Sequence, residues 1–289
     1  MKRGLAILLG ILSTLQAQTS VSSLLEQKLL KQLDRLDEKL TGVLGVAAID
    51  LRTGHTIAYH ADAVFPQASS IKIPILMELF RQVKAGKLRL EENVTLKKEE
   101  SVGGSGHLQI ALRSRDLTVT VQDLAAAMIE TSDNTATNKL ISMVGMDSVN
   151  ALIASFGLKQ TRLQRRMLER GAAAADRENI STPMEMARLV EALYKAGDES
   201  KPMIGILKRV DADFRRVTPS TTEVAAKPGE LNGVRAETGI ILLEKRPFVL
   251  SVMSTFLAPD ENPVPTVARL FYEHFEKLGN SNLYGHNLQ

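Results

Sequence analysis

The stretch FPQASSIKIP, residues 65–74, marks the point where the pattern of the chain changes from strands to helices. Before it, Val43–Leu51 is a nearly continuous apolar run, a turn follows, and Thr56–His60 is a second run. Two such runs around a short turn predict a hairpin of buried strands. After it, helical spacing dominates from Ile73 to Gly197, and no strand pattern interrupts it strongly.

The strand pattern returns after Pro219, in three apolar runs at Glu223–Lys227, Ala236–Leu243 and Phe248–Phe256. Amphipathic helices are expected near the two ends, at Ser22–Leu40 and Val264–Leu278. Because a lone hairpin is only marginally stable, the strands from both ends are expected to share one sheet.

We therefore expect an α/β (α+β) fold, with a five-stranded antiparallel sheet flanked by the terminal helices and an inserted all-helical lobe. Residues 18–65 and 219–289 are assigned to the sheet lobe and residues 66–218 to the helical lobe, within a single domain. The crevice where the lobes meet is the first place to look for chemistry, since ligand sites often lie between such units.

Composition excludes several classes of function. The 289 residues are 44% apolar and 24% charged, as in ordinary globular proteins, and the net charge of +3 gives no support for a nucleic-acid partner. There is no cysteine, so thiolate metal sites and a cysteine nucleophile are excluded. The five histidines show no metal-binding spacing, and we expect neither a metal nor a cofactor.

Residues 1–17 have the pattern of a secretory signal peptide. Lys2 and Arg3 form a positive end, Leu5–Leu12 is apolar, and Ala17 is a small residue at the cut. The protein is thus expected in the periplasm or outside the cell. Retention of this segment as an uncleaved membrane anchor is the alternative, because Leu15 is a mediocre residue for cleavage.

The quoted stretch contains Ser69-x-x-Lys72 at the start of a helical pattern. Positions i and i+3 lie on one helix face, so the amine of Lys72 can reach the hydroxyl of Ser69. A lysine whose pKa is lowered by burial or positive charge can activate a serine nucleophile. Taken alone the motif is weak, and a capping serine with a solvated lysine explains most such occurrences.

Two further motifs follow in the chain. Ser132-Asp133-Asn134 lies between two helical runs and supplies a hydroxyl for proton transfer, an aspartate to fix the loop and an amide to hold Lys72 and a carbonyl. Its simpler interpretation is a helix N-cap. Lys227-Pro228-Gly229 ends a predicted strand and offers a cation for a carboxylate, or simply a turn.

The order and spacing of the three motifs are rarely produced by chance. With them the chain resembles the class A β-lactamases and related penicillin-binding serine hydrolases, from the N-terminal helix to Leu278. Phe65-Pro66, the string SDNTA and Thr182-Pro183 add to the likeness. The resemblance implies a β-lactamase/transpeptidase-like fold and an acyl-enzyme mechanism without a cofactor.

The resemblance also implies roles for individual residues. It makes Ser69 the nucleophile, Lys72 the acylation base and Ser132 a proton shuttle. It places Asn134 on the amide carbonyl of the substrate and Lys227 on Ser132 and the substrate carboxylate. Gly229 lets the substrate lie along the strand edge, and the backbone N–H groups of Ser69 and Glu230 would form the oxyanion hole.

Two departures from the family pattern affect the expected chemistry. Pro228 stands where a threonine or serine hydroxyl usually helps to bind the carboxylate, and Thr238 stands where an arginine is expected. Arg235 is a candidate replacement. In the loop before Thr182, Met167 takes the place of the deacylating glutamate, and Glu169 lies two residues later.

Glu169 is therefore a candidate catalytic residue, and its other interpretation, a surface ion-pair partner of Arg165 or Arg166, carries equal weight. Asn179 stands where an aspartate usually anchors this loop to Arg165. We expect slow deacylation as a consequence.

The function predicted first is an exported serine hydrolase that opens the β-lactam ring of penicillin-type antibiotics, a resistance activity. Its partner would be a small β-lactam or a peptidoglycan-like peptide, and the protein is expected to be a monomer. The alternatives are an enzyme resembling D-Ala-D-Ala peptidases and a penicillin-binding or sensor protein that stays acylated.

Overall fold

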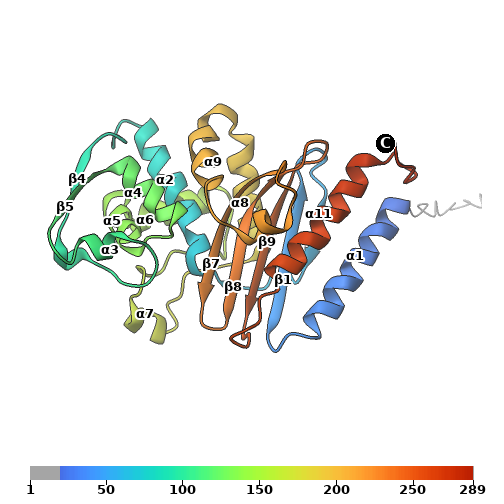
Figure 1. Ribbon diagram of the computed structural model, residues 1–289, viewed down its shortest axis with the longest axis horizontal. Coiled ribbons are helices and arrows are strands. Elements are labelled where there is room, and N and C mark those ends of the chain that lie inside the picture. Colours follow the sequence, from blue (N-terminus) through green and yellow to red (C-terminus); the bar gives the residue numbers. More distant parts are fainter. Residues whose placement is uncertain (1–19, 289) are drawn as a thin grey trace, which may run out of the picture.

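A computed structural model describes residues 20–288. At its centre is one five-stranded sheet in the order β2-β1-β9-β8-β7, in which all neighbours are antiparallel. Its strands are β1 (Val43–Asp50), β2 (Thr56–Tyr59), β7 (Glu223–Leu231), β8 (Val234–Leu242) and β9 (Phe248–Thr255). The predicted fold class is confirmed, and strands from both ends of the chain share the sheet (Figure 1).

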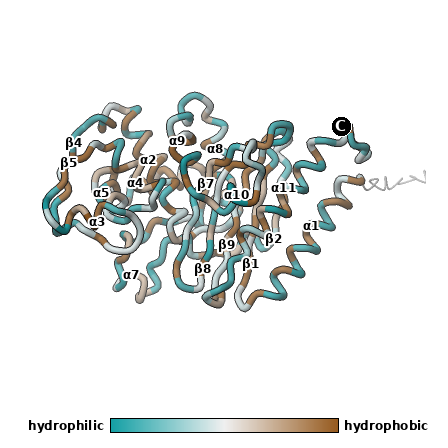
Figure 2. The backbone as a smooth tube through the Cα atoms, viewed as in Figure 1, coloured by the Kyte–Doolittle hydropathy of each residue, from teal (hydrophilic) through white to brown (hydrophobic). Residues whose placement is uncertain are grey.

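The sheet strands are apolar over most of their length because helices cover both faces of the sheet. Seven of the eight residues of β1 are buried, as are seven of the eight in β9. The terminal helices α1 (Val21–Asp37) and α11 (Val264–Asn280) pack together at one side of the molecule (Figure 1). Along α1, hydrophobic and hydrophilic residues alternate as an amphipathic helix requires (Figure 2).

Two helices within residues 66–218, at 183–195 and 213–217, pack on the sheet and so differ from the predicted lobe boundary. Helix α8 (Pro183–Lys195) falls within residues 66–218 but packs against β1, β8 and β9 rather than with the helical lobe. Its buried face, which includes Met186 and Val190, covers the sheet. Helical periodicity reveals an apolar face but not the surface that this face covers, so the sequence assigned α8 to the wrong layer.

The helical lobe lies beside the β7 edge of the sheet (Figure 1). Its main helices are α2 (Lys72–Lys84), α4 (Val121–Glu130), α5 (Asn134–Val144) and α6 (Met146–Ser155). The shorter helices are α3 (Leu108–Ala111), α7 (Arg170–Ala174), α9 (Lys201–Leu207) and the 3₁₀ helices η1 (Ala68–Ile71), η2 (Lys98–Glu100) and η3 (Gly197–Ser200). Helix α10 (Asp213–Val217) packs instead against α11, β7 and β8.

Two short strand pairs also occur where the sequence predicted none. They are β3 (Phe65–Pro66) with β6 (Ile180–Ser181), and β4 (Asn93–Leu96) with β5 (Leu117–Thr120). The expectation of an uninterrupted helical middle was therefore wrong. Apolar and polar residues do alternate in β4 and β5, but these strands have only two to four residues, and a run of that length is too short to stand out from its surroundings.

The predicted signal peptide at residues 1–17 lies outside the described residues. Within residues 20–288, no helix is both long enough and apolar enough to cross a membrane.

Candidate active site

The turn from β3 into α2 exposes Ser69 and buries Ser70. Ala68 has a φ of +47°, an unusual value for a residue other than glycine, and η1 then leads directly into α2 at Lys72. Ser70 is fully buried, and its hydroxyl donates to the carbonyl of Gln67 at 2.7 Å. Ser69 is half-buried and lines a cavity. The turn therefore presents the hydroxyl of Ser69, and not that of Ser70, to solvent.

Lys72 is buried directly behind this turn. Its Nζ donates to the carbonyl of Ser132 at 2.8 Å, to Ser132 Oγ at 3.0 Å and to Asn134 Oδ1 at 3.1 Å. Burial, followed by the positive charge of Lys227, holds the pKa of Lys72 well below the ordinary lysine value. A lowered pKa increases the share of the unprotonated amine, which is the form that can accept a proton.

The second motif forms a loop fixed by Asp133. Asp133 caps α5, and its two carboxylate oxygens accept the N–H groups of Ala136 and Leu108, each at 2.9 Å. Ser132 adopts a φ of +55°, so its carbonyl and hydroxyl both accept from Lys72. Backbone strain of this kind is commonly kept where function requires it.

The third motif lies on β7, the edge strand of the sheet. Lys227 is buried, and its Nζ donates to the carbonyl of Pro228 at 3.1 Å. Burial lowers the pKa of Lys227 to about 8, and the negative charge of Glu237 partly opposes this shift. The expected hydrogen bond between Lys227 and Ser132 is absent among the described residues: Lys227 donates to Pro228, and Ser132 Oγ accepts from Lys72.

Gly229 lets the edge of β7 approach the serine turn closely. A Cβ atom at this position would lie 2.6 Å from the carbonyl oxygen of Gln67 and 2.7 Å from the backbone nitrogen of Ser69. Any larger residue would push the strand away from the turn. This contact places the backbone after Gly229 next to the N–H of Ser69.

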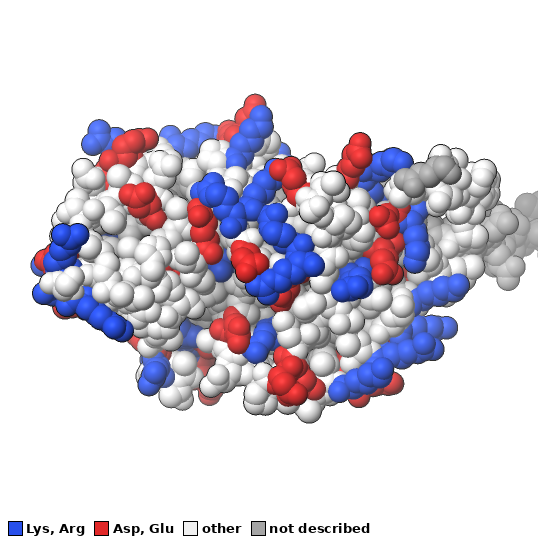
Figure 3. All heavy atoms as spheres, viewed as in Figure 1, with Lys and Arg blue, Asp and Glu red and all other residues white. Residues whose placement is uncertain are grey.

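A cavity of about 290 Å³ opens over these groups. It is lined by residues of all three motifs and of the sheet edge, among them Ser69, Ser132, Lys227, Gly229, Glu230 and Arg235. Arg235 pairs with Glu230 at 3.0 Å, and a second lining arginine, Arg216, pairs with Asp211 and Asp213. In the view of Figure 3, basic and acidic side chains are also intermixed over the part of the surface that covers the sheet.

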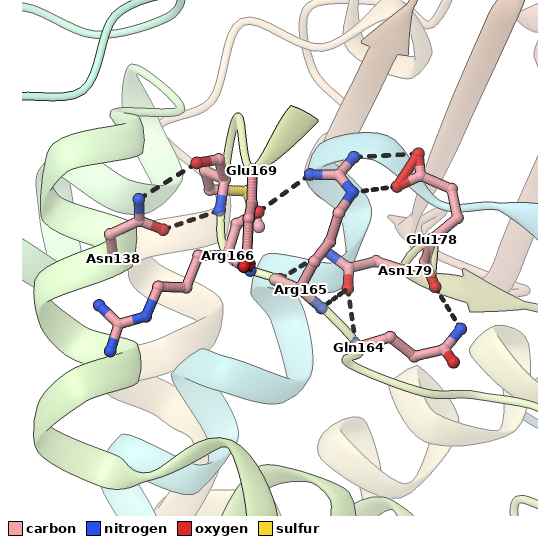
Figure 4. Close-up of polar contacts among 8 residues, drawn as sticks. Asn138, Gln164, Arg165, Arg166, Glu169, Glu178 and Asn179 are labelled. Atoms are coloured by element: carbon pink, nitrogen blue, oxygen red, sulfur yellow. Dashed lines mark hydrogen bonds and ion pairs between the residues drawn. The ribbon is translucent and has the colours of Figure 1, made fainter. Parts of the chain in front are cut away.

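Two neighbouring side chains, the carboxylate of Glu178 and the amide of Asn179, hold the two ends of the loop between Thr161 and Ser181 together (Figure 4). The guanidinium of Arg165 pairs with the carboxylate of Glu178. Asn179 holds the backbone instead, accepting the N–H groups of Gln164 at 2.8 Å and Arg165 at 3.1 Å. The anchoring role expected of one aspartate is therefore divided between Glu178 and Asn179.

Glu169 is not brought together with the other predicted catalytic residues. Its carboxylate is exposed and accepts the backbone N–H of Arg166 at 3.0 Å, within its own loop (Figure 4). It forms no ion pair with the side chains of Arg165 or Arg166 in the described part of the chain. Met167 is buried, and its backbone is bonded to Asn138.

Some residues of this region were missed by the sequence analysis. Glu178 directly precedes Asn179 and could have been noted as a carboxylate near Arg165 in the loop. Glu237 could have been found as a charged residue within a buried strand, which is costly without partners. Asn138 and Arg216 carry no comparable signal, because nothing in the sequence places them near the site.

The fold and the site together define a serine hydrolase in which a buried lysine lies behind the serine turn. The model of the β-lactamase enzyme family matches residues 28–275. The β-lactamase SME-1 of Serratia marcescens is 28% identical over 244 residues, covering 80% of this chain and 82% of that protein. The β-lactamase Toho-1 of Escherichia coli is 32% identical over 190 residues, 64% of each chain.

A solved structure with a similar fold is also a β-lactamase. A β-lactamase from Sphaerobacter thermophilus superposes with a TM-score of 0.78 at 28% identity, covering 87% of this chain and 97% of that one. The chain therefore belongs to the β-lactamase enzyme family, and the resemblance seen in its motifs is confirmed.

Proposed function

We propose that this serine β-lactamase acts through an acyl-enzyme on Ser69. Ser69 Oγ attacks the lactam carbonyl carbon while Lys72 takes its proton, and Ser132 then delivers a proton to the leaving nitrogen as the C–N bond breaks. The N–H groups of Ser69 and Glu230 would hold the oxyanion. The observation that carries this proposal is the buried, hydrogen-bonded position of Lys72 behind a turn that exposes Ser69.

The substrate is proposed to be a small β-lactam that carries a carboxylate, or a peptide with the same feature. Asn134 would bind its amide carbonyl and Lys227 its carboxylate, along the edge that Gly229 leaves open. Pro228 offers no hydroxyl to this carboxylate. Arg235 lines the cavity and would supply a second cation once its pair with the exposed Glu230 is broken.

Slow deacylation is part of the proposal. Hydrolysis of the acyl ester needs a base that activates water, a contribution typically worth about 10²–10⁴ in rate. Met167 cannot supply it, and Glu169 points its carboxylate at its own loop backbone. The acyl-enzyme should therefore accumulate, and turnover should show a burst followed by a slow steady rate.

Intact mass measured over time after mixing with benzylpenicillin tests acylation and turnover together. One penicillin mass should be gained and slowly lost. Ser69→Ala should abolish the adduct, whereas the matched variant Ser70→Ala should keep it. An adduct that never leaves would favour the penicillin-binding or sensor alternative, and release of D-alanine from a D-Ala-D-Ala peptide would favour the peptidase.

We further propose that the protein is exported after cleavage near Gln18, and that it acts as a monomer without a metal. Expression in a Gram-negative host should give a periplasmic product, and chelators should leave its rate unchanged. An intact Met1 in the membrane fraction would contradict cleavage. Light scattering that gives a dimer mass would contradict the monomer.

A further inference from the structure

The terminal helices α1 and α11 carry an exposed surface that the proposed reaction does not use. Helix α1 contacts β2, one edge strand of the sheet, whereas the serine turn in η1 contacts β7, the opposite edge strand. The terminal helices and the helical lobe lie at opposite ends of the molecule (Figure 1). This surface therefore lies away from the active-site cavity.

One exposed face of α1 carries three cations. Lys28, Lys31 and Arg35 follow one another at spacings of three and four residues, which places them on the same side of the helix. Val21 and Leu24 continue this face toward the start of the helix, and both side chains are exposed. A row of basic side chains along α1 is visible in Figure 3.

The three cations line a groove between α1 and α11, together with Lys277 of α11. Glu273 is the only carboxylate in this lining among the described residues. Within residues 20–288, none of the four cations forms an ion pair or a side-chain hydrogen bond. The groove thus has a positive charge that no neighbouring side chain neutralises.

A hollow of about 610 Å³ adjoins this groove at the start of α1. Leu25 and Lys277 line both the groove and the hollow, so the two are continuous. Val21, Leu278 and Leu283 add apolar side chains to the hollow. A cationic part and an apolar part of the surface therefore lie side by side.

The C-terminal turn extends the apolar part. Leu283 is 88% exposed and Tyr284 is 84% exposed. The turn is closed by hydrogen bonds, one of which runs from the backbone N–H of Asn282 to the carbonyl of His286 at 3.0 Å. An ordered turn thus holds two bulky side chains in water, beside the hollow and the cations.

An anionic lipid bilayer matches both parts of this surface. Basic side chains are attracted to negatively charged headgroups, and exposed leucine and tyrosine side chains are stabilised in the interfacial layer of a membrane. A second copy of the chain would bring the same cations to the groove and be repelled. The predicted signal peptide also precedes α1, so this end of the chain is the one that meets a membrane during export.

We propose that the terminal-helix surface, formed by the α1–α11 groove, the hollow and the C-terminal turn, docks the mature protein reversibly onto an anionic bilayer. Its cations contact the phosphate groups of the lipids, and Leu283 and Tyr284 enter the interfacial layer. The active-site cavity stays open because it lies at the opposite edge of the sheet. This inference goes beyond the proposed function and does not depend on acylation.

Sedimentation with lipid vesicles tests the inference directly. The protein is used from Gln18, its proposed mature start, so every described residue is kept. With vesicles of equal parts phosphatidylglycerol and phosphatidylcholine, most of the protein should pellet at about 0.05 M NaCl and be released at about 0.5 M. Vesicles of phosphatidylcholine alone should leave it in the supernatant. Absence of pelleting with the anionic vesicles, or equal pelleting with both, would overturn the inference.

Lys28→Glu combined with Lys31→Glu reverses two charges of the groove. Each basic residue near an anionic surface strengthens binding several-fold, so the apparent affinity for the anionic vesicles should fall by about tenfold or more. The matched control, Lys97→Glu with Lys98→Glu, reverses two exposed charges at η2 in the helical lobe and should keep the wild-type affinity. An equal loss in both double variants would contradict a defined docking surface.

Leu283→Ser combined with Tyr284→Ser tests the apolar part and should also weaken vesicle binding. Ile110→Ser, at an exposed position of α3, should not. A wild-type dimer that dissociates in the Leu283/Tyr284 double variant would show that the surface binds a second copy, and would overturn the inference. Vesicle-bound protein should still gain one benzylpenicillin mass, and an adduct that forms only on the free protein would contradict the proposed orientation.

Discussion

The side-chain amide of Asn138 bonds both the N–H and the carbonyl of Met167. Its Oδ1 accepts the N–H of Met167 at 2.8 Å, and its Nδ2 donates to the carbonyl of Met167 at 3.2 Å (Figure 4). The backbone at this position is thus fixed by the side chain of a neighbouring helix, whatever side chain residue 167 itself carries. The loop keeps its attachment to α5 although the glutamate expected from the family resemblance is missing.

This attachment makes Met167→Glu an informative variant. The carboxylate would occupy the position that the resemblance assigns to the deacylation base, and we expect the steady-state rate with benzylpenicillin to rise by about tenfold or more. Stopped-flow and intact mass should show the burst shrinking as the acyl-enzyme clears faster. Met167→Gln has the same size without a charge and should leave the rate unchanged, so an equal gain in both variants would contradict a base at this position.

Glu169→Gln should have little effect on turnover. The carboxylate is exposed and bonds to the backbone N–H of Arg166, a contact that the amide oxygen of glutamine can also make. We expect the burst and the steady-state rate with benzylpenicillin to stay within about twofold of wild type, since surface changes of this kind are small. A large loss of steady-state rate with the burst preserved would show instead that Glu169 moves into the site and acts as the base.

Lys72→Arg tests whether the lysine acts by losing its proton. Arginine keeps the positive charge but does not deprotonate in proteins, so a role as base would be lost. Acylation of Ser69 should slow by about 10²–10⁴. In the wild type, burial holds the pKa of Lys72 well below the ordinary value, so the acylation rate should fall as the pH drops through that lowered pKa. An Arg variant that acylates at the wild-type rate would exclude Lys72 as the base.

The sheet could be predicted from the sequence because its strands are long apolar runs, and β1 and β9 match the predicted ranges within two residues. The three motifs were found for a similar reason, since each is a short continuous string. Helix α10, which lines the cavity through Asp213 and Arg216, could not be placed there in this way. Its link to the sheet joins Asp213 and Glu237, which are 24 residues apart in the chain and carry no shared pattern.

The site also shows where analogy alone misplaces a residue. Glu169 was selected because it is an acid close in sequence to an expected acid, but two residues along an irregular loop are enough to turn a side chain elsewhere. Leu168, just before it, has a φ of +58° and redirects the backbone. Sequence distance does not determine the direction of a side chain in such a loop.

Asn179 should contribute more to stability than its place in a loop suggests. Its side chain is buried and makes three hydrogen bonds to the backbone of Gln164 and Arg165. Asn179→Ala leaves those groups without partners and should lower the free energy of unfolding by about 1–3 kcal/mol. Urea unfolding measures the loss. Gln122→Ala, at an exposed position of α4, should change stability by less than about 0.5 kcal/mol, and an equal loss in both would contradict the anchoring role.

His274 should make the protein sensitive to mild acid. It is buried on α11, and burial, with Arg246 and Lys277 as smaller causes, lowers its pKa to about 4. Because the unfolded chain binds a proton near pH 6.5 and the folded protein does not, stability is complete above pH 6.5 and falls as the pH drops toward 4. Between pH 7 and 4.5 this group alone should cost about 2 kcal/mol.

His274→Gln should reduce that acid sensitivity, because glutamine takes up no proton in this range. The change in urea midpoint between pH 7 and 4.5 should therefore be smaller than in the wild type, even though the variant is less stable at pH 7 through lost packing. His286→Gln, at an exposed position, should keep the wild-type change. If His274→Gln and the wild type lose the same stability on acidification, another group takes up the proton and the buried neutral state assigned to His274 is wrong.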